Sequence, residues 1–187
     1  MIDRKIILLT TSRRPTRRIR TFCRDLTRVI PGVIRTNRGK MSIEDVAEKA
    51  LEEKLNRVLI IDRWKGGPGR MRLYKIENGK IIQIPPQIYI RGIKLQREFR
   101  RGERTVKSLV LKGVSDESSE TMRLADAFSS FLNIPVMDVK KASHKPEAVM
   151  QIRRVEDGLI SLSFFSLPNM IEIGPRVTIS HLIWDLQ

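Results

Sequence analysis

The sequence predicts an α/β protein made of two tandem, pseudo-repeated halves with mixed sheets. Short apolar runs alternate with segments in which apolar residues recur every three or four positions, the pattern of strands and amphipathic helices. Asn-Gly and Asp-Gly pairs between later apolar runs predict hairpins. Phe22/Leu26 and Phe128/Leu132 hold matching places in two strand–helix–strand units roughly 105 residues apart. This match indicates an internal duplication, with coincidence between two ordinary units as the alternative.

The first unit is expected to be a strand, a helix and a second strand. Residues 6–9 form a short apolar run typical of a buried strand. A Thr-Thr-Ser run and a proline follow, which is a helix-start signal. Between residues 15 and 30 the apolar side chains lie three and four positions apart, so a helix with one apolar face is expected there. A Pro-Gly pair ends it, and residues 33–36 predict the second strand.

The rest of the first half contains a second helix and a hairpin. Ser42 and Asp45 resemble a helix capping arrangement. The glycine-rich segment 65–70 predicts a flexible connection, and Asn78-Gly79 predicts a hairpin turn. Pro85-Pro86 is expected to interrupt the strand pattern. The further strands expected in this half are residues 57–64, 71–77, 80–84 and 88–95.

The second half is expected to repeat this order. The basic stretch 96–104 is the expected junction, so we predict one half at residues 1–97 and the other at residues 98–187. A helix is expected over residues 121–132, and Asp157-Gly158 predicts a hairpin. The strands expected in this half are residues 106–111, 136–139, 148–155, 159–165 and 177–186.

The composition supports a packed core and predicts a polyanionic partner. Hydrophobic residues make up 41% of 187 residues, whereas 36 Lys and Arg face 21 Asp and Glu, giving a net charge of +15 and a pI of about 10.6. Such an excess destabilises a compact state by self-repulsion, so nucleic acid is the first candidate partner. The alternative is a solvated basic surface or an extremophile's charge habit.

No segment predicts a membrane span or a secreted protein. No window approaches the ~18 to 20 apolar residues of a membrane helix, and the run at 6–9 is too short for a signal-peptide core. Cys23 is the single cysteine, which excludes an internal disulfide and a cysteine cluster for zinc. It is expected to be a packed thiol on the apolar side of its helix. We therefore expect a reducing cytoplasm and no membrane partner.

The positive charge is concentrated at the start of the chain. Residues 1–40 hold twelve Lys and Arg but only two acids, whereas Asp116, Glu117 and Glu120 make the start of the second half's helix acidic. The first half is therefore expected to carry most phosphate contacts.

The start of the first helix suits phosphate. Its unpaired N–H groups and dipole attract anions, hydroxyl groups donate to them, and guanidinium groups grip them with two bonds. If the first two strands are parallel, the loops after both lie at one sheet edge. The alternative is a solvated helix face. The RNA-binding candidates here are Thr11, Ser12, Arg13, Arg14, Arg17, Arg18, Arg35, Asn37, Arg38 and Lys40; those of the second half are Lys140, Lys141, His144, Lys145 and Arg176. For Arg176, a structural turn is equally well supported.

Aromatic side chains are scarce, at 5% of the chain. Phe22, Phe128 and Phe131 lie on predicted apolar helix faces, where core packing is expected. Trp64 could stack on a base, but packing at the core or its rim is at least as well supported. Readers of single strands normally display several aromatics on a strand face. We therefore expect recognition of RNA backbone and shape more than of base sequence.

Two segments resemble the terminal signatures of the Brix-domain family. The N-terminal one comprises Thr11-Ser12-Arg13-Arg14-Pro15, Phe22, Leu26, Pro31 and Arg35-Thr36-Asn37-Arg38-Gly39, and the C-terminal one is Ile173-Gly174-Pro175-Arg176. The resemblance covers residues 4–186, and the chain is similar to the short archaeal members, without the tails of eukaryotic relatives.

The resemblance implies a fold and a role. Each half would be similar to the anticodon-binding domain of class IIa aminoacyl-tRNA synthetases. The protein would bind ribosomal RNA or its precursor and assist ribosomal RNA processing and subunit assembly. Ribosomal proteins and other assembly factors are further candidate partners.

No catalytic constellation is present in the sequence, so we expect no enzyme activity, no cofactor and no metal. The glycine-rich segment lacks the Gly-Lys-Ser/Thr ending of a phosphate-binding loop, and no histidine and carboxylate have zinc-ligand spacing. Two alternatives stay open. One is a nuclease-like enzyme acting on RNA through Asp62 and His144. The other is a docking module whose acidic second half binds basic ribosomal proteins.

Overall fold

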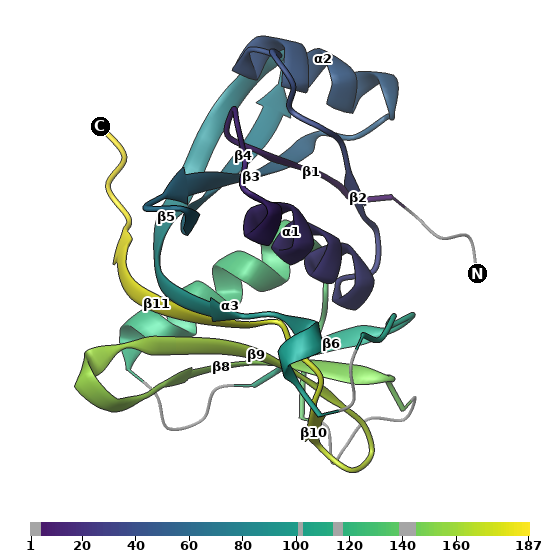
Figure 1. The fold of residues 1–187 in the computed structure, drawn as a ribbon, viewed down its shortest axis with the longest axis vertical. Coiled ribbons are helices and arrows are strands. Elements are labelled where there is room, and N and C mark those ends of the chain that lie inside the picture. The colour runs from purple at the N-terminus through teal and green to yellow at the C-terminus, as the bar shows by residue number, and fades with distance from the viewer. Residues whose placement is uncertain (1–4, 101–102, 114–117, 139–144) are drawn as a thin grey trace.

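The fold is a single mixed sheet with α-helices on it, which confirms the predicted α/β class (Figure 1). The computed structural model describes residues 5–100, 103–113, 118–138 and 145–187. The elements of the first half are β1 (Ile7–Thr11), α1 (Arg17–Val29), β2 (Val33–Arg35), α2 (Ile43–Glu52), β3 (Arg57–Trp64), β4 (Gly67–Glu77) and β5 (Lys80–Lys94). Those that follow are η1 (Gln96–Glu98), β6 (Leu109–Lys112), α3 (Ser119–Leu132), β7 (Val136–Met137), β8 (Ala148–Arg154), η2 (Glu156–Gly158), β9 (Ile160–Ser166), β10 (Ile171–Glu172) and β11 (Arg176–Ile183).

The sheet runs in the order β2-β1-β3-β4-β5-β11-β9-β8-β6-β7, with β10 paired to β9. β1 is parallel to β2 and β3, β6 is parallel to β7 and β8, and the other pairs are antiparallel. The strands expected in two sheets form one because the long β5 pairs with β4 along residues 80–89 and with β11 along residues 87–94. This pairing covers two edges that would otherwise expose backbone N–H and C=O groups.

Helices cover the first half of the sheet on both faces. Successive strand residues point to opposite faces, so Ile7 and Leu9 of β1 face α1 while Leu8 faces α2. Phe22 of α1 and Phe128 of α3 belong to one core that includes strands of both halves. Figure 1 shows α1 and α3 enclosed between the two limbs of the bent sheet, with α2 outside.

Local capping explains where the helices begin. Ser42 Oγ accepts the Asp45 N–H at 3.0 Å while Asp45 Oδ2 accepts the Ser42 N–H at 2.8 Å, so the predicted capping box of α2 is confirmed. α1 begins after Thr16, whose Oγ1 accepts the Ile19 N–H at 3.4 Å. The cap therefore follows Pro15, whereas the sequence signal placed it before the proline.

Two expectations for the first half were wrong. The segment 65–70 is not a flexible connection, because β4 already begins at Gly67 and only Lys65 and Gly66, both at positive φ, form the turn. Pro85-Pro86 does not separate two strands, since β5 runs through it. The β4–β5 register shifts between Met71 and Leu73, opposite the prolines. A bulge thus removes the need for the N–H groups that proline lacks.

The expected hairpins at Asn78-Gly79 and Asp157-Gly158 are confirmed. All four residues have positive φ, between 50° and 74°. Asn78-Gly79 forms a two-residue turn between Glu77 and Lys80, whereas Asp157-Gly158 lies in the longer connection between Arg154 and Ile160. Asparagine, aspartate and glycine adopt positive φ most readily.

A buried polar cluster ties the two halves together. Asp25 of α1 is fully buried, and its Oδ2 accepts the Gln96 N–H at 2.9 Å. The Gln96 side chain donates to the carbonyls of Arg104 at 3.0 Å and Gly174 at 3.3 Å. Arg28 Nη1 lies 2.5 Å from a Glu103 oxygen but 3.9 Å from Asp25 Oδ1, which has no hydrogen-bond partner among the residues that the structure describes.

Replacing Asp25 with Asn should raise the stability at neutral pH. Burial raises the pKa of Asp25 above its usual value, against the opposing effects of the Gln96 N–H and Arg28. A raised folded-state pKa means that stability is lost as the pH rises from the unfolded pKa through the folded one. Asparagine keeps an acceptor for Gln96 without the charge. Urea unfolding should therefore show a higher free energy of unfolding for Asp25→Asn than for the unmodified protein at pH 7, and this difference should vanish near pH 4. A loss of stability at pH 7 would contradict this.

The Cys23 thiol should be inert in the folded protein. The side chain is fully buried in the core, as expected, and burial raises its pKa to about 12. At pH 8 about one thiol in 10⁴ would then be ionised. An aromatic disulfide reagent should label Cys23 only after urea is added. Rapid labelling in native buffer would show that the α1 face opens readily.

Candidate nucleic-acid interface

β1 and β2 are parallel, which is the condition under which the loops after both were expected at one edge of the sheet, and β3 ends at the same edge. Leu9 is in register with Arg35, and Thr11 with Ile61. The loop after β1 (residues 12–16), the loop after β2 (residues 36–42) and the β3–β4 turn therefore lie side by side. α1 starts at the same edge, so its unpaired N–H groups point in the same direction as these loops.

Hydrogen bonds fasten these loops to one another. The Ser12 N–H donates to Ile61 O at 2.9 Å, and Ser12 Oγ accepts the Arg63 N–H at 3.0 Å. Thr16 Oγ1 donates to Gly66 O at 2.9 Å. The start of α1 and the tip of the β3–β4 hairpin are thus held as one unit. The Ser12 hydroxyl hydrogen is not used in these bonds and can still be donated.

Arg38 is buried under this edge and holds the loop after β2. It is 7% exposed, and it donates from Nε to Met41 O at 2.7 Å and from Nη1 to Thr11 O at 3.2 Å. Burial lowers the pKa of Arg38, and the charges of Arg13 and Arg72 add to this effect. The structure therefore gives Arg38 and the buried Thr11 a place behind the surface rather than on it.

Five of the candidate cations are exposed at the edge; we call them the basic edge, and they are Arg13, Arg14, Arg17, Arg35 and Lys40. Among the described residues, no carboxylate lies within 4.0 Å of any of them. Hydrogen bonds with Ser42 lower the pKa of the Asp45 carboxyl group, and the charge of Arg13 adds to this effect from longer range. The predicted Asn37 is exposed in the same loop.

Arg18 has a different role from its neighbours. Its Nη2 donates to Ile93 O at 2.9 Å and to Glu98 Oε2 at 3.2 Å. The side chain therefore links the first turn of α1 to the end of β5. The charge of Arg18 is partly compensated, unlike that of the basic edge.

The second-half candidates do not join the basic edge. Lys140, Lys141 and His144 lie outside the described residues, and Lys145 is exposed before β8. Arg176 forms an ion pair with Glu172, with Nε 2.7 Å from Oε1, and its guanidinium group lies 5.7 Å from the centre of the Phe99 ring. This environment favours the structural interpretation of Arg176.

The two alternative functions receive little support from the described residues. Asp62 accepts hydrogen bonds from Arg70 at 2.7 Å and Arg72 at 2.9 Å, so it is held between two guanidinium groups rather than presented as a metal ligand or base. Glu120 pairs with Arg154 at 3.1 Å, while Asp116 and Glu117 lie outside the described residues.

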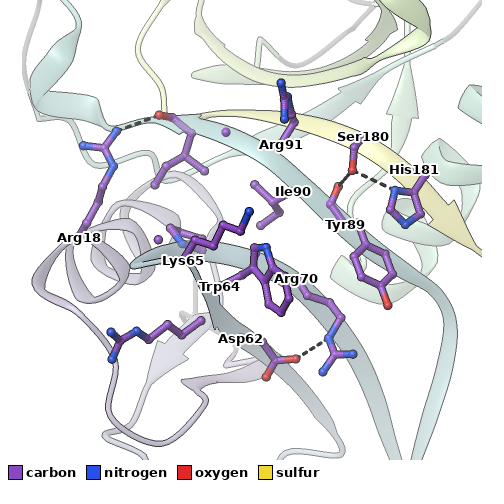
Figure 2. A pocket seen from close by; sticks show the side chains of 16 residues that line it. Arg18, Asp62, Trp64, Lys65, Arg70, Tyr89, Ile90, Arg91, Ser180 and His181 are labelled. Atoms are coloured by element: carbon purple, nitrogen blue, oxygen red, sulfur yellow. Dashed lines mark hydrogen bonds and ion pairs between the residues drawn. The ribbon is translucent and has the colours of Figure 1, made fainter.

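A groove beside the basic edge was not predicted from the sequence. Its volume is about 1010 Å³, and its walls come from the first turn of α1, the β3–β4 hairpin, β5 and β11. Figure 2 shows Trp64 and Lys65 of the hairpin facing this space, with Tyr89 and His181 on the far side. We call it the aromatic groove. Its residues come from segments that are distant in the sequence, so only Trp64, beside Lys65, is a candidate for base stacking from the sequence alone.

Within the described residues, none of the helices is both long enough and apolar enough to cross a membrane. The same residues contain no group of three or more His, Cys, Asp and Glu side chains placed to hold a metal ion.

No protein-family model matches the sequence. Individual proteins do match, among them several archaeal proteins described as probable Brix domain-containing ribosomal biogenesis proteins. The protein from Pyrococcus abyssi is 30% identical over 195 residues, covering 97% of this chain and 85% of its own length. That from Aeropyrum pernix is 35% identical over 121 residues, 64% of this chain and 67% of the relative. That from Thermococcus kodakarensis is 43% identical over 94 residues, 50% of this chain and 45% of the relative.

Two solved structures share the fold. The crystal structure of a probable ribosomal biogenesis protein from Aeropyrum pernix superposes with a TM-score of 0.76 at 28% identity, covering 94% of this chain and 96% of that one. An archaeal Imp4-like protein gives a TM-score of 0.67 at 22% identity, covering 95% and 99% of the two chains.

Replacing Arg38 with Ala should destabilise the protein more than replacing Lys40. Removing the buried guanidinium leaves the carbonyls of Thr11 and Met41 without their donors, which should cost about 2 to 4 kcal/mol. Lys40→Ala, from the same loop but exposed, is the matched control and should change stability by less than about 0.5 kcal/mol. Urea unfolding measures both. Equal, small effects would show that Arg38 does not hold the loop.

Proposed function

The chain belongs to the Brix-domain family of ribosome-biogenesis proteins, and from that premise we propose that it is an RNA-binding assembly factor. It binds ribosomal RNA or its precursor in the cytoplasm and assists RNA processing and subunit assembly. The basic edge provides the main contact, through phosphate groups. No catalytic step is part of this proposal.

The observation that carries the proposal is the uncompensated charge of the basic edge. Arg13, Arg14 and Arg17 are exposed within five residues of one another, and no described carboxylate pairs with them. A bound phosphate chain would supply the missing negative charge and release counterions. Such contacts also explain why a chain with a net charge of +15 tolerates its own repulsion.

The backbone adds to this charge. The first N–H groups of α1 lack helical partners and lie at the positive end of the helix dipole. An arginine guanidinium group beside these N–H groups can bind one phosphate through two parallel hydrogen bonds, while a neighbouring guanidinium group binds the next phosphate along the RNA. Arg38 and Arg18 support this surface from behind by fixing the loops after β2 and β5.

Ribosomal proteins and other assembly factors are further partners in this proposal. The names of the relatives associate them with ribosome biogenesis. Lys145 and the undescribed Lys140, Lys141 and His144 are proposed as additional phosphate contacts of the second half. Arg176 is proposed to stabilise the turn before β11, where Glu172 already pairs with it.

We also propose that the halves 1–97 and 98–187 descend from one duplicated unit. The strand order supports it, because β2-β1-β3-β4-β5 from one edge corresponds to β7-β6-β8-β9-β11 from the other. In each half a parallel strand–helix–strand unit leads into antiparallel strands. The likeness of each half to a synthetase anticodon-binding domain stays a prediction.

Replacing Arg13, Arg14 and Arg17 together with Ala should weaken RNA binding and flatten its salt dependence. With roughly five phosphate contacts, the slope of log affinity against log salt should be near −3 to −4 for the unmodified protein. Losing three contacts should shift it toward zero by about 2. Fluorescence anisotropy with a labelled ribosomal RNA fragment measures both quantities.

The matched control is the triple variant Lys75→Ala, Lys80→Ala and Arg153→Ala. It removes the same charge, but Lys75 of β4 and Lys80 of β5 lie near the β4–β5 turn, at the opposite end of the hairpin from the basic edge, and Arg153 lies on β8. This variant should keep most of the affinity. Equal losses in both variants would mean that net charge alone attracts RNA. RNA cleaved in the presence of magnesium, and no longer cleaved by Asp62→Ala, would favour an enzyme instead.

A further inference from the structure

The aromatic groove contains a large apolar side chain that the fold leaves in solvent. Trp64 ends β3 and is 68% exposed. A residue of this size normally buries most of its surface, so its exposure at the rim of a groove points to a ligand rather than to core packing. Figure 2 shows the indole standing in the groove beside Lys65. Of the two alternatives for Trp64, its exposure excludes packing in the core and leaves base stacking.

The position of Trp64 is fixed by its surroundings. The Lys65-Gly66 turn pairs Trp64 with Gly67, and Gly69 lies so close that a Cβ there would overlap the tryptophan. Thr16 Oγ1 holds the turn through Gly66 O, and the Arg63 guanidinium donates to Arg14 O at 3.3 Å. The hairpin tip is therefore presented in a set orientation, which lowers the entropic cost of binding a ring against it.

The opposite wall also presents aromatic rings. Tyr89 of β5 and His181 of β11 are stacked, with centroids 4.3 Å apart and ring planes 12° from parallel. Ser180 Oγ fixes this pair from behind, at 3.2 Å from Tyr89 O and 3.0 Å from His181 Nδ1. The groove thus has ring systems on two sides.

Positive charge surrounds these rings. Arg18, Arg63, Lys65, Arg70 and Arg91 line the groove, against one acid, Asp62. Arg70 is paired with Asp62, and Arg18 with Glu98. No carboxylate among the described residues lies within ion-pair distance of Arg63, Lys65 or Arg91. Flat rings beside unpaired cations match the chemistry of a nucleotide, which has a π face and a phosphate.

We propose that the aromatic groove holds an unpaired segment of RNA, with one base stacked on Trp64 and neighbouring phosphates on Lys65, Arg63 and Arg91. This rests on the proposed RNA-binding function and adds the form of RNA that is bound. Bases inside a duplex are already stacked and cannot reach a tryptophan. The volume lies at the top of the range of about 300 to 1000 Å³ for pockets that hold small ligands, enough for a base and its flanking groups.

The groove continues from the basic edge. Arg18 connects them, because it lies in the first turn of α1 and also donates to Ile93 O on the groove wall. Arg63 connects them again through Arg14 O. One RNA strand can therefore pass from the phosphate contacts at the start of α1 to the stacking position. The recognition would combine backbone contacts with sequence-tolerant stacking.

Trp64→Ala tests the proposal by comparing two RNAs of about twelve nucleotides per strand, one single-stranded and one duplex. The substitution should weaken single-strand binding about 5- to 150-fold and leave duplex binding within about twofold. Trp64→Phe should keep most of the single-strand affinity. Leu51→Ala, which removes an exposed apolar side chain on α2, is the control and should change neither.

A fluorescence measurement reports on the same contact without relying on the alanine variant. Trp184→Phe leaves Trp64 as the single tryptophan. Its emission should be quenched by saturating single-stranded RNA and unchanged by the duplex. Unchanged emission would overturn this inference, and so would an equal loss of affinity for the single-stranded and the duplex RNA in Trp64→Ala. Either result would leave RNA binding by the basic edge intact. If Trp64→Ala instead weakened only the capture of an acidic peptide, the groove would bind protein. Failure of the unmodified protein to bind either RNA would reject the proposed function itself.

Discussion

The parallel pairing of β1 with both β2 and β3 is the constraint on which the rest of the surface depends. Parallel strands end at the same edge, so three connections and the start of α1 must share one side of the sheet. Hydrogen bonds fasten those connections together: Ser12 Oγ accepts one from the Arg63 N–H, and Thr16 and Arg38 donate to Gly66 O and Thr11 O. Cations that are dispersed over residues 13 to 40 thereby form one surface.

The junction between the halves places a second surface beside the first. β5 continues past its partner β4 and pairs with β11, so the sheet bends around α1 and α3. Tyr89 and His181 meet only because of this pairing. Arg18 then connects α1 to the end of β5, and the buried Asp25 connects the same helix to Gln96. The basic edge and the aromatic groove are therefore parts of one structural frame rather than two independent sites.

Features that depend on neighbouring residues could be predicted from the sequence. The Ser42/Asp45 capping box, the Asn78-Gly79 turn and the apolar face of α1 each follow from a pattern a few residues long. The strand–helix–strand order also placed the loops after the first two strands at one edge, on the condition that the strands are parallel. The predicted interruption at Pro85-Pro86 was wrong because the pairing of β5 with β4 forms a bulge at the prolines, and β5 continues through it.

Roles set by distant partners could not be predicted. Arg38 shares its sequence context with the exposed Lys40, yet the carbonyl of Thr11 draws it inside. Arg18 and Arg17 are adjacent in the chain, but only Arg18 meets β5. Asp62 is a lone acid in its stretch of sequence, but in the structure Arg70 and Arg72 of β4 donate hydrogen bonds to it. The aromatic groove depends on α1, the β3–β4 hairpin, β5 and β11, which are separated in the sequence, and no single segment carries its signature.

The most direct test of the central claim is a map of ultraviolet crosslinks between the protein and precursor ribosomal RNA, read by mass spectrometry. The account predicts crosslinks within residues 12–18, the loop after β2 and the hairpin tip at Trp64 and Lys65. Crosslinks confined to α2, or to the β8–β9 surface of the second half, would contradict it.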